Sequence, residues 1–538
     1  MQHMHMLKAG GALTPALYLL SYLGVGNPGS SILQAILLLP LMGAVCVIFL
    51  PSSDQDTHKS IALLTSLITF VLSLFLWVLF DHHTPEFQFV TEFHTLMRAS
   101  GTPISFGVDG VSLLLILLTC VLVSICLLLG WDQGAMGESV SRDTKVSGLQ
   151  TRGTGSGVTT LNNLKAYYVS LLVLQTLLIA VFTVLDLLLF YIFFEGVLVP
   201  MYFIIGIWGS RERKITAAYM FFLYTLFGSL FMLLAILMVY FQTGSTDIHT
   251  LYLSEISKSR QLILWLAFFF SFAVKVPMIP LHLWLPEAHV EAPTSGSVML
   301  AGILLKLGAY GFLRYSIPVL PYASSYFAPM VWVLSVLAIL YASLSCLRQI
   351  DLKKIVAYSS VAHMGFVTLG LFGNAPEGAL FLMLSHGVVS SALFVCVGQL
   401  YERHKTRLLT YYGGIVQVMP VFSSIFFLFT LGNLSMPCTS NFVGEFMVLL
   451  HTYNTNKVCG TLAATGMVLG GGYSIWMYNR VVFGTRPKVE FISHFADLDR
   501  REFCSLLPLI FLLFWMGIYP QAFINVFHAS VAHLCMPS

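Results

Sequence analysis

Apolar runs of about 20 residues recur along almost the whole length of this chain. A helix needs about 20 apolar residues to cross the hydrocarbon core of a bilayer, so these runs predict membrane-spanning helices. The chain has 538 residues, of which 57% are hydrophobic and 9% are charged, whereas about 25% of residues are charged in soluble domains. We therefore predict an all-α polytopic membrane protein of about 14 transmembrane helices, near residues 31–50, 60–80, 111–131, 165–185, 187–208, 215–241, 261–281, 296–315, 328–347, 353–373, 377–401, 415–451, 460–484 and 503–530.

Prolines interrupt two of these runs. Pro277 and Pro280 fall within 261–281, and Pro437 falls within 415–451, which is too long for one straight span. Proline frees backbone groups that lipid cannot satisfy, so a break is tolerated only where it is buried in protein or lines a wet cavity. Two broken segments five helices apart predict two inverted five-helix repeats, helices 4–8 and 9–13, with a site near the midplane.

The predicted repeats divide the chain into four parts. These are an N-terminal part with helices 1–3 and a polar insert (1–164, insert 132–164), a first repeat (165–315), a second repeat (328–484), and a C-terminal loop with helix 14 (485–538). The insert is rich in Gly, Ser and Thr, which is typical of a flexible loop. The apolar stretch 11–24 is interpreted as an extension ahead of the first helix, with a short membrane-surface helix as one conformation.

Charge and cysteine content limit the class of function. Loops after odd-numbered helices carry most of the basic residues, which places them on the matrix or cytoplasmic face and both termini on the other. The formal net charge of +3 is too small to indicate nucleic-acid binding. The nine cysteines form no CxxC pair and lie mostly in apolar runs, so we expect buried apolar residues. Without a nucleotide-binding or iron–sulfur motif, we expect this chain to bind no cofactor or metal.

Four ionisable residues fall deep within the predicted spans. Lys306 lies about 15 Å from the start of its run and Glu195 about 13 Å from one end of its own, at about 1.5 Å per residue. Lys275 adjoins the first break, and Glu445 follows the second. A charge at such depth costs several kcal/mol and is a functional candidate by default. We interpret Glu195 as an ion-pair partner that controls the charge of a lysine, because a nearby carboxylate favours charged lysine while desolvation favours the neutral form.

Histidines accompany these residues. His363 and His386 lie near the middle of their runs, and His282 follows the first break. A histidine titrates near neutrality, which suits a proton relay. The nearby Glu287, His289 and Glu291 are interpreted mainly as a solvated turn. We therefore expect a row of relay residues across the membrane plane, namely Glu195, Lys275, His282, Lys306, His363, His386 and Glu445.

At these residues the sequence resembles the subunit 4 family of respiratory complex I (NADH:ubiquinone oxidoreductase). These antiporter-like subunits are related to Mrp-type cation/proton antiporters. The motifs that carry the resemblance are FFEGVLVPMYFIIGIWG, KVPMIPLHLWLPEAHVEAPTSG, DLKKIVAYSSVAHMGFV, LMLSHGVVSSALF and NFVGEF, and it extends over about residues 165–483. The N-terminal extension and the insert 132–164 depart from the family pattern, but both lie outside the expected relay.

The resemblance assigns roles to the candidate residues. Glu195 matches the family's acidic residue on helix 5, Lys275 the lysine of broken helix 7, Lys306 the lysine of helix 8, and Glu445 the glutamate of broken helix 12. His282, His363 and His386 match its relay histidines. The resemblance implies proton pumping by a chain that carries no redox chemistry, within a complex that uses FMN, iron–sulfur clusters and ubiquinone in other subunits.

The implied partners are other membrane-arm subunits, including neighbouring antiporter-like subunits, and membrane lipids such as cardiolipin. The implied location is the mitochondrial inner membrane, with a bacterial plasma membrane as the alternative. Two other functions remain open from the sequence: a stand-alone or Mrp-type cation/proton antiporter subunit, and a purely structural membrane scaffold.

Overall fold

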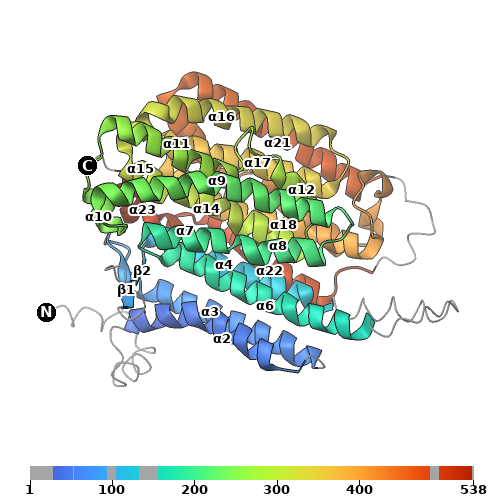
Figure 1. Cartoon of the computed structure of the whole chain (residues 1–538). Coiled ribbons are helices and arrows are strands. Elements are labelled where there is room, and N and C mark those ends of the chain that lie inside the picture. Colours follow the sequence, from blue (N-terminus) through green and yellow to red (C-terminus); the bar gives the residue numbers. More distant parts are fainter. Residues whose placement is uncertain (1–27, 52–53, 94–103, 133–155, 485–495, 536–538) are drawn as a thin grey trace, which may run out of the picture.

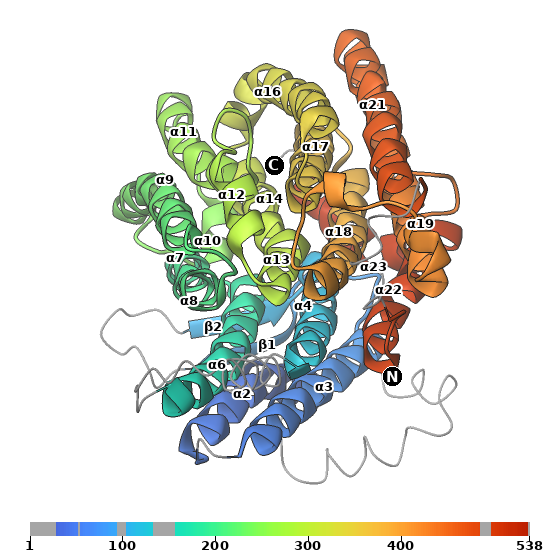
Figure 2. The same cartoon turned by 90° about the vertical axis from the view of Figure 1, so that its right-hand side faces the viewer.

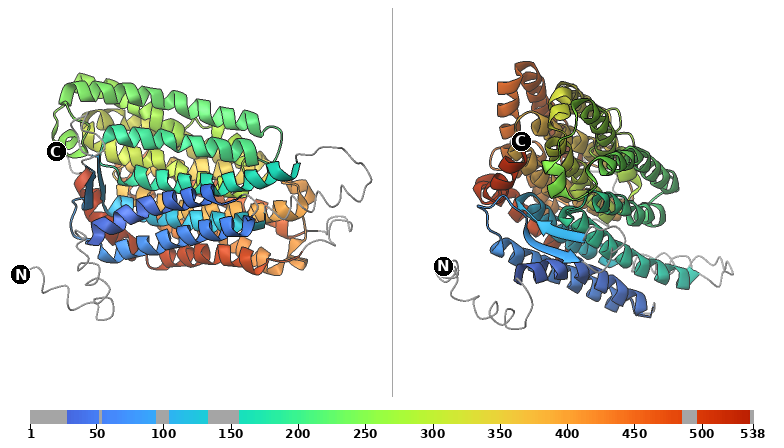
Figure 3. Two further views of the ribbon diagram at one scale, coloured as in Figure 1. Left: turned by 60° about the horizontal axis from the view of Figure 1, so that its bottom comes forward. Right: turned by 60° about the vertical axis from the view of Figure 1, so that its left-hand side comes forward.

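Long helices run side by side through the molecule (Figure 1 and Figure 3), for which a computed structural model describes residues 28–51, 54–93, 104–132, 156–484 and 496–535. Within this part of the chain, twelve helical spans are long and apolar enough to cross a membrane. They are α2 (Pro28–Phe49), α3 (Gln55–Leu79), α4 (Gly110–Leu129), α6 (Ser156–Thr183), α7 with α8 (Leu187–Gly196, Leu198–Trp208), α9 (Lys214–Thr243), a composite span made of α13 (Thr294–Met299), η4 (Leu300–Leu304), α14 (Leu305–Gly311), η5 (Phe312–Ser316) and α15 (Ile317–Val319), then α16 (Pro321–Arg348), α17 (Leu352–Phe372), α18 (Pro376–His404), α21 (Lys457–Val482) and α22 (Arg500–Ile518). The predicted polytopic helical architecture is confirmed, and the count of fourteen stays a prediction.

Both segments with central prolines are interrupted. The first consists of α11 (Lys258–Lys275), several turns and α12 (Trp284–Glu291). The second consists of α19 (Pro420–Asn433) and α20 (Ser440–Thr455), which have 14 and 16 residues and are short for a span. Each break is only partly enclosed by this chain: Val276, Met278, Ser435 and Thr439 are buried, whereas Pro280, Met436, Pro437 and Cys438 are exposed on its outer surface.

Two local predictions are wrong, and one short element was not predicted. The run 503–530 is two helices, α22 and α23 (Gln521–Cys535), because Pro520 cannot continue the first one. The predicted loop 132–164 ends early, since α6 begins at Ser156. An antiparallel hairpin of β1 (Gln88–Phe93) and β2 (Ile104–Val108) interrupts the all-α pattern. The stretch 11–24 lies outside the described residues.

The cysteines also differ from the expectation. All nine are free, but only four of them are buried, namely Cys120, Cys126, Cys346 and Cys396. Four others are exposed on the outer surface of this chain, namely Cys46, Cys438, Cys504 and Cys535. A run of apolar residues therefore predicts membrane depth, but it does not say which side of a helix faces lipid or a neighbouring chain.

Alternate loops gather at opposite ends of the bundle. At one end, which lies on the right in Figure 1, Arg407 donates to Ser210 Oγ (2.9 Å) and its carbonyl accepts from the Leu352 amide (3.0 Å). All three residues lie in or next to loops that follow odd-numbered predicted helices, so we call this end of the bundle the odd-loop end. At the other end lie the hairpin and α10 (Ile248–Leu253), where the Leu187 amide donates to the Thr246 carbonyl (2.9 Å). This segregation agrees with the alternation of basic residues along the chain.

Four spans occupy the centre of the bundle: α4, the composite α13–α15 span, α17 and α18 (Figure 2). In each of them 89–100% of the most apolar 18-residue window is buried, compared with 28–44% in α2, α3, α9, α16, α21 and α22. Polar side chains on the central spans cannot reach lipid headgroups, so each has to find partners inside the protein. Two 3-10 turns, η6 (Leu409–Tyr411) and η7 (Ile415–Gln417), then lead from α18 to α19.

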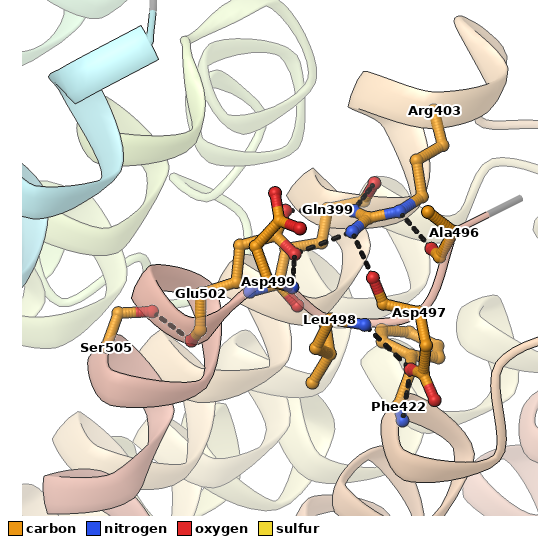
Figure 4. A network of polar contacts seen from close by, with 9 residues as sticks. All are labelled: Gln399, Arg403, Phe422, Ala496, Asp497, Leu498, Asp499, Glu502 and Ser505. Atoms are coloured by element: carbon orange, nitrogen blue, oxygen red, sulfur yellow. Dashed lines mark hydrogen bonds and ion pairs between the residues drawn. The ribbon is translucent and has the colours of Figure 1, made fainter.

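A polar network fixes the C-terminal helices at the odd-loop end (Figure 4). Arg403, near the end of α18, binds both carboxylate oxygens of Glu502 on α22, at 2.9 and 2.6 Å. Its Nε donates to the Ala496 carbonyl at 2.9 Å. The Asp497 carboxylate accepts from the Val421 and Phe422 amides (3.0 and 3.1 Å), which lie in the first turn of α19. The network therefore holds α18, α19 and α22 together.

Replacing Arg403 with alanine should destabilise this end of the molecule. Glu502 and the Ala496 carbonyl would lose their donors in a largely buried site, at a cost of about 1–3 kcal/mol in the free energy of unfolding. The measurement is the midpoint of thermal unfolding in detergent, with Arg500→Ala as a matched control, since Arg500 is exposed at the start of α22, the helix that carries Glu502. Equal midpoints for the two variants would contradict the assigned role.

Candidate functional site

Lys306 lies on α14, between the π-helical turns η4 and η5, and it is completely buried. Its Nζ donates to the Ala301 carbonyl at 2.5 Å and lies 2.9 Å from His386 Nδ1 on α18. A π-helical turn alters the i→i+4 bonding and makes backbone carbonyls available, which is why such turns are frequent at functional sites. The lysine therefore has polar partners at a depth where water cannot supply them.

Two glycines allow the lysine and the histidine to meet. A Cβ on Gly302 would lie 2.8 Å from Ser391 Oγ, and a Cβ on Gly387 would lie 3.0 Å from the Gly302 carbonyl oxygen. Both distances are shorter than ordinary contacts of a Cβ atom. A larger residue at either position would push α18 away from η4 and would separate Lys306 from His386.

A second buried cluster continues from His386. The His386 ring lies 5.6 Å from the His363 ring, centroid to centroid, at an angle of 50°. His363 Nδ1 lies 2.7 Å from Glu445 Oε1, and its Nε2 lies 3.1 Å from Asn433 Oδ1. The Asn433 amide donates to Ser474 Oγ at 2.9 Å, which fixes its orientation. Five elements thus converge here: α17, α18, both halves of the second broken segment, and α21, which carries Ser474.

The partners of His363 restrict where its protons lie. Asn433 Oδ1 can only accept, so Nε2 carries a proton. The bond between Nδ1 and Glu445 then has one further proton, which lies either on the imidazolium or on the carboxyl group. The two arrangements differ only in the position of one proton along a 2.7 Å contact. The site can therefore hold a proton and transfer it without moving a helix.

Lys275 ends α11 and is buried beside α14. Its Nζ donates to the Phe194 carbonyl at 3.3 Å and lies 4.2 Å from the centre of the Phe194 ring. A Cβ on Gly308 would lie 3.1 Å from the Lys275 Cβ, so α11 and α14 are in close contact two residues from Lys306. Among the described residues, however, no direct hydrogen bond joins the two lysines.

Glu195 shares the surroundings of Lys275 without a direct bond to it. Both carboxylate oxygens are buried, and neither has a hydrogen-bond partner among the residues that the structure describes. The carboxylate and the Lys275 ammonium nonetheless act on each other electrostatically. Ile192 and Val199, three residues before and four after Glu195, are about half exposed, so this helix borders the outer surface of the chain. The predicted pair is an electrostatic one rather than a contact ion pair.

His282 lies in the turn after the first break and is buried. In the described part of the chain neither of its ring nitrogens has a hydrogen-bond partner, and the Tyr341 and Tyr358 rings lie 5.8 and 6.1 Å away. Among the described residues it makes no hydrogen bond to the other candidates. The structure thus brings Lys306, His386, His363 and Glu445 together, places Lys275 and Glu195 nearby, and leaves His282 apart.

The predicted solvated turn is largely buried. Glu287 is partly exposed and binds Lys354 at 2.8 Å. His289 and Glu291, in contrast, are 0% and 3% exposed. The prediction is wrong for these two residues because α12 packs against α9 and α17 inside the bundle, with the His289 ring stacked on Phe394 of α18.

Sequence reasoning also missed several buried polar residues. Lys353, in the first turn of α17, is only 2% exposed. Asn433 ends the helix four residues before Pro437, a position from which a side chain can reach the break. Asp109 and Arg314 form a buried ion pair of 2.6 Å between α4 and η5. An acidic helix cap and an arginine within an apolar run are signals that could have indicated these residues.

The chemistry available to this site is proton transfer. It contains buried amine, imidazole and carboxyl groups within hydrogen-bond distance of one another, and these groups exchange protons. In the described part of the chain, no group of three or more His, Cys, Asp or Glu residues could hold a metal ion. The arrangement is therefore suited to moving protons within the membrane plane.

Comparisons with known proteins agree with this fold. The family model described as "NADH:quinone oxidoreductase/Mrp antiporter, TM" matches residues 184–470. The NADH-ubiquinone oxidoreductase chain 4 of Marchantia polymorpha is 53% identical over 510 residues, covering 94% of this chain and 97% of the relative. That of Arabidopsis thaliana is 53% identical over 507 residues, covering 93% and 96%.

Solved structures give the same result. A chain of respiratory complex I from Thermus thermophilus aligns with a TM-score of 0.79 at 27% identity, over 94% of this chain and 100% of that chain. A chain of the Mrp complex from Dietzia sp. aligns with a TM-score of 0.77, over 95% and 98%, but at 16% identity it shows the fold alone. With about half of its residues identical to those curated relatives over nearly their full length, this chain belongs to the NADH-ubiquinone oxidoreductase chain 4 family.

Proposed function

We propose that this chain is a membrane-arm subunit of NADH:ubiquinone oxidoreductase that translocates protons through its buried Glu, Lys and His residues. The observation that carries the proposal is the pair of short contacts in the lipid-free centre, Lys306–His386 (2.9 Å) and His363–Glu445 (2.7 Å). Buried ionisable groups are expensive, and a purely structural site would be equally stable with apolar residues.

The proposed relay runs from Glu195 and Lys275 through Lys306, His386 and His363 to Glu445. The Glu195 carboxylate favours the charged form of Lys275, while burial favours the neutral form, so a change in their separation would release a proton. The step from Lys275 to Lys306 needs a water molecule or a side-chain movement, since no direct bond joins them. His282 has two free ring nitrogens beside the first break and would serve access to Lys275.

The second half of the relay requires less movement. A proton on Lys306 can pass to His386 Nδ1 along an existing hydrogen bond. The imidazolium can release a proton from Nε2 toward His363 once Glu445 has given up the proton that it shares with His363, because His363 Nε2 already carries a proton bonded to Asn433. His363 shares its proton with Glu445, which is the proposed terminal donor. The net result is one proton moved from Lys306 to Glu445; His386 is left with its proton on Nδ1 instead of Nε2, and a rotation of its ring resets it.

The remaining assignments follow the family. Electron transfer by FMN, iron–sulfur clusters and ubiquinone would take place in other subunits, and its free energy would reach this chain through electrostatic or conformational coupling. The proposed partners are the other membrane-arm subunits, including neighbouring antiporter-like ones, and membrane lipids such as cardiolipin. The proposed location is the mitochondrial inner membrane.

An Mrp-type antiporter is the alternative, and it is less well supported. The similarity to the Mrp complex is limited to the fold, at 16% identity, whereas the curated relatives at 46–53% identity carry the name of complex I chain 4. Purification distinguishes the two, because the proposed subunit should copurify with flavin- and iron–sulfur-containing chains.

Replacing Glu445 with glutamine should abolish the proton shared with His363. Glutamine keeps the shape but cannot ionise, so we expect proton pumping coupled to NADH oxidation to fall by about tenfold or more, the order of a lost acid–base group. The measurement is acidification by the assembled complex in vesicles. Glu377→Gln is the matched control, because that carboxylate binds His528 near the surface at 2.7 Å. Unchanged pumping by Glu445→Gln would overturn the proposal.

Replacing Lys275 with methionine should interrupt the first half of the relay. Methionine retains the length and apolar packing of the lysine stem, so assembly should persist while coupled pumping falls by a similar factor. Lys258→Met, at the exposed start of the same helix, should pump as the wild type does. Equal pumping rates for the two variants would exclude Lys275 from the relay.

A further inference from the structure

The Lys275 ammonium has a partner that the proposed relay does not use, the aromatic ring of Phe194. The Lys275 Nζ lies 4.2 Å from the centre of that ring and donates to the backbone carbonyl of the same residue at 3.3 Å. In the described part of the chain, the amine makes no other hydrogen bond. A cation over the face of an aromatic ring is attracted by the quadrupole of the ring. One residue thus supplies both contacts of the charged group.

The surroundings of Phe194 are apolar and buried. Its ring meets the Phe272 ring edge to face at a centroid distance of 6.0 Å and the Phe190 ring at 5.4 Å. All three phenylalanines are 0% exposed, and Lys275 is 2% exposed. A cation–π contact is stronger where the cation is removed from water than at an exposed site. We therefore expect the Phe194 ring to contribute substantially to holding the charge of Lys275.

The contact with Phe194 lies on the side of the span that carries Lys306. The Phe272 ring, which packs against Phe194, lies so close to Gly311 that it leaves no room for a Cβ atom there. Gly311 ends α14, the helix of Lys306. The rings of Phe194 and Phe272 therefore connect α7 and α11 with α14. An ammonium that rests on Phe194 is held on the inner side of its helix, toward the centre of the bundle.

Glu195 offers the Lys275 ammonium a different position. It follows Phe194 in α7, and consecutive side chains on a helix point about 100° apart. Ile192 and Val199, which share its side of the helix, are about half exposed, so the carboxylate lies nearer the outer surface than the buried Phe194 ring. The flexible stem of a lysine allows its ammonium to reach either position by side-chain rotation. In the structure, the ammonium occupies the position at Phe194.

We propose that Phe194 is a positioning residue that holds the charged form of Lys275 away from Glu195 and on the side of Lys306. This inference rests on the proposed function, because it concerns the lysine in the first half of the relay. The ring attracts the protonated amine and not the neutral one, so only a lysine that carries a proton is held in the inner position. Once the proton has left, the neutral amine is no longer held there and is free to move back toward Glu195. Phe194 itself exchanges no proton.

The test compares variants of the assembled complex reconstituted in vesicles. Phe194→Met removes the ring but keeps a flexible apolar side chain, so coupled proton pumping should fall by about tenfold, the order expected for a lost cation–π contact away from water. Phe194→Tyr keeps an aromatic face and should pump at close to the wild-type rate. Wild-type pumping by Phe194→Met, or a loss in Phe194→Tyr as large as that in Phe194→Met, would overturn the proposal.

Phe190→Met is the matched control for lost packing. Phe190 is also completely buried on α7 and its ring packs against that of Phe194. Among the described residues it makes no cation–π contact with Lys275. Pumping by Phe190→Met should therefore stay close to that of the wild type. Equal losses in Phe190→Met and Phe194→Met would show that only packing matters and would contradict the proposal.

The position of the Lys275 amine gives a second readout, which does not depend on pumping. Phe194→Leu also removes the ring, and leucine is smaller than phenylalanine, so this variant applies even if Phe194→Met does not assemble. In its structure, the Lys275 Nζ should lie within hydrogen-bond distance of the Glu195 carboxylate. An amine that still binds the carbonyl of residue 194, as in the wild type, would refute the assigned role.

Lys275→Met, measured in parallel, separates the role of Phe194 from the relay itself. Loss of pumping in Lys275→Met with normal pumping in Phe194→Met would refute only the role of Phe194. Normal pumping in Lys275→Met would exclude Lys275 from the relay, and the role of Phe194 would fall with it.

Discussion

The organisation of this protein depends on the cost of burying ionisable groups in the middle of a membrane. A lysine at that depth has to be paired with a polar group, neutral or hydrated. Here Lys306 is paired with His386 on α18 and with the Ala301 carbonyl of the π-helical turn η4. Lys306 reaches His386 only because Gly302 and Gly387 let η4 and α18 approach closely. The same requirement explains why the four central spans are almost wholly buried: lipid-facing positions could not satisfy these side chains.

The two broken segments differ in how their buried ionisable side chains are partnered. In the second one, α19 ends at Asn433 and α20 carries Glu445, so both halves contribute a partner to His363. The network of Arg403, Asp497 and Glu502 fixes the start of α19 at the far end of that helix, and thereby the position of Asn433. In the first one, Lys275 lies at the end of α11 and interacts with Glu195 only through space. In the proposed relay, the second broken segment is therefore where a proton is held, and the first is where a change of distance can act.

The sequence predicts the elements of this arrangement better than it predicts their contacts. Run length and Pro277 and Pro437 were sufficient for the helices and for both breaks, because the bilayer fixes the first and proline chemistry the second. Depth counting placed Lys306 and His386 correctly within their helices, but it could not say that residues 80 positions apart are 2.9 Å from each other. It failed at His289 and Glu291, since the direction in which a chain leaves a break depends on packing, here against α9 and α17. Pro520 was overlooked inside an apolar run, and the short hairpin has no run at all.

The central claim is that one proton is shared between His363 and Glu445 and changes position during turnover. Infrared difference spectroscopy of the assembled complex measures this most directly, because a protonated carboxyl group absorbs separately from a carboxylate. The account predicts a carboxyl band that changes when NADH is supplied and that is absent in Glu445→Gln. A difference spectrum without such a band, or with one that Glu445→Gln leaves unchanged, would contradict it.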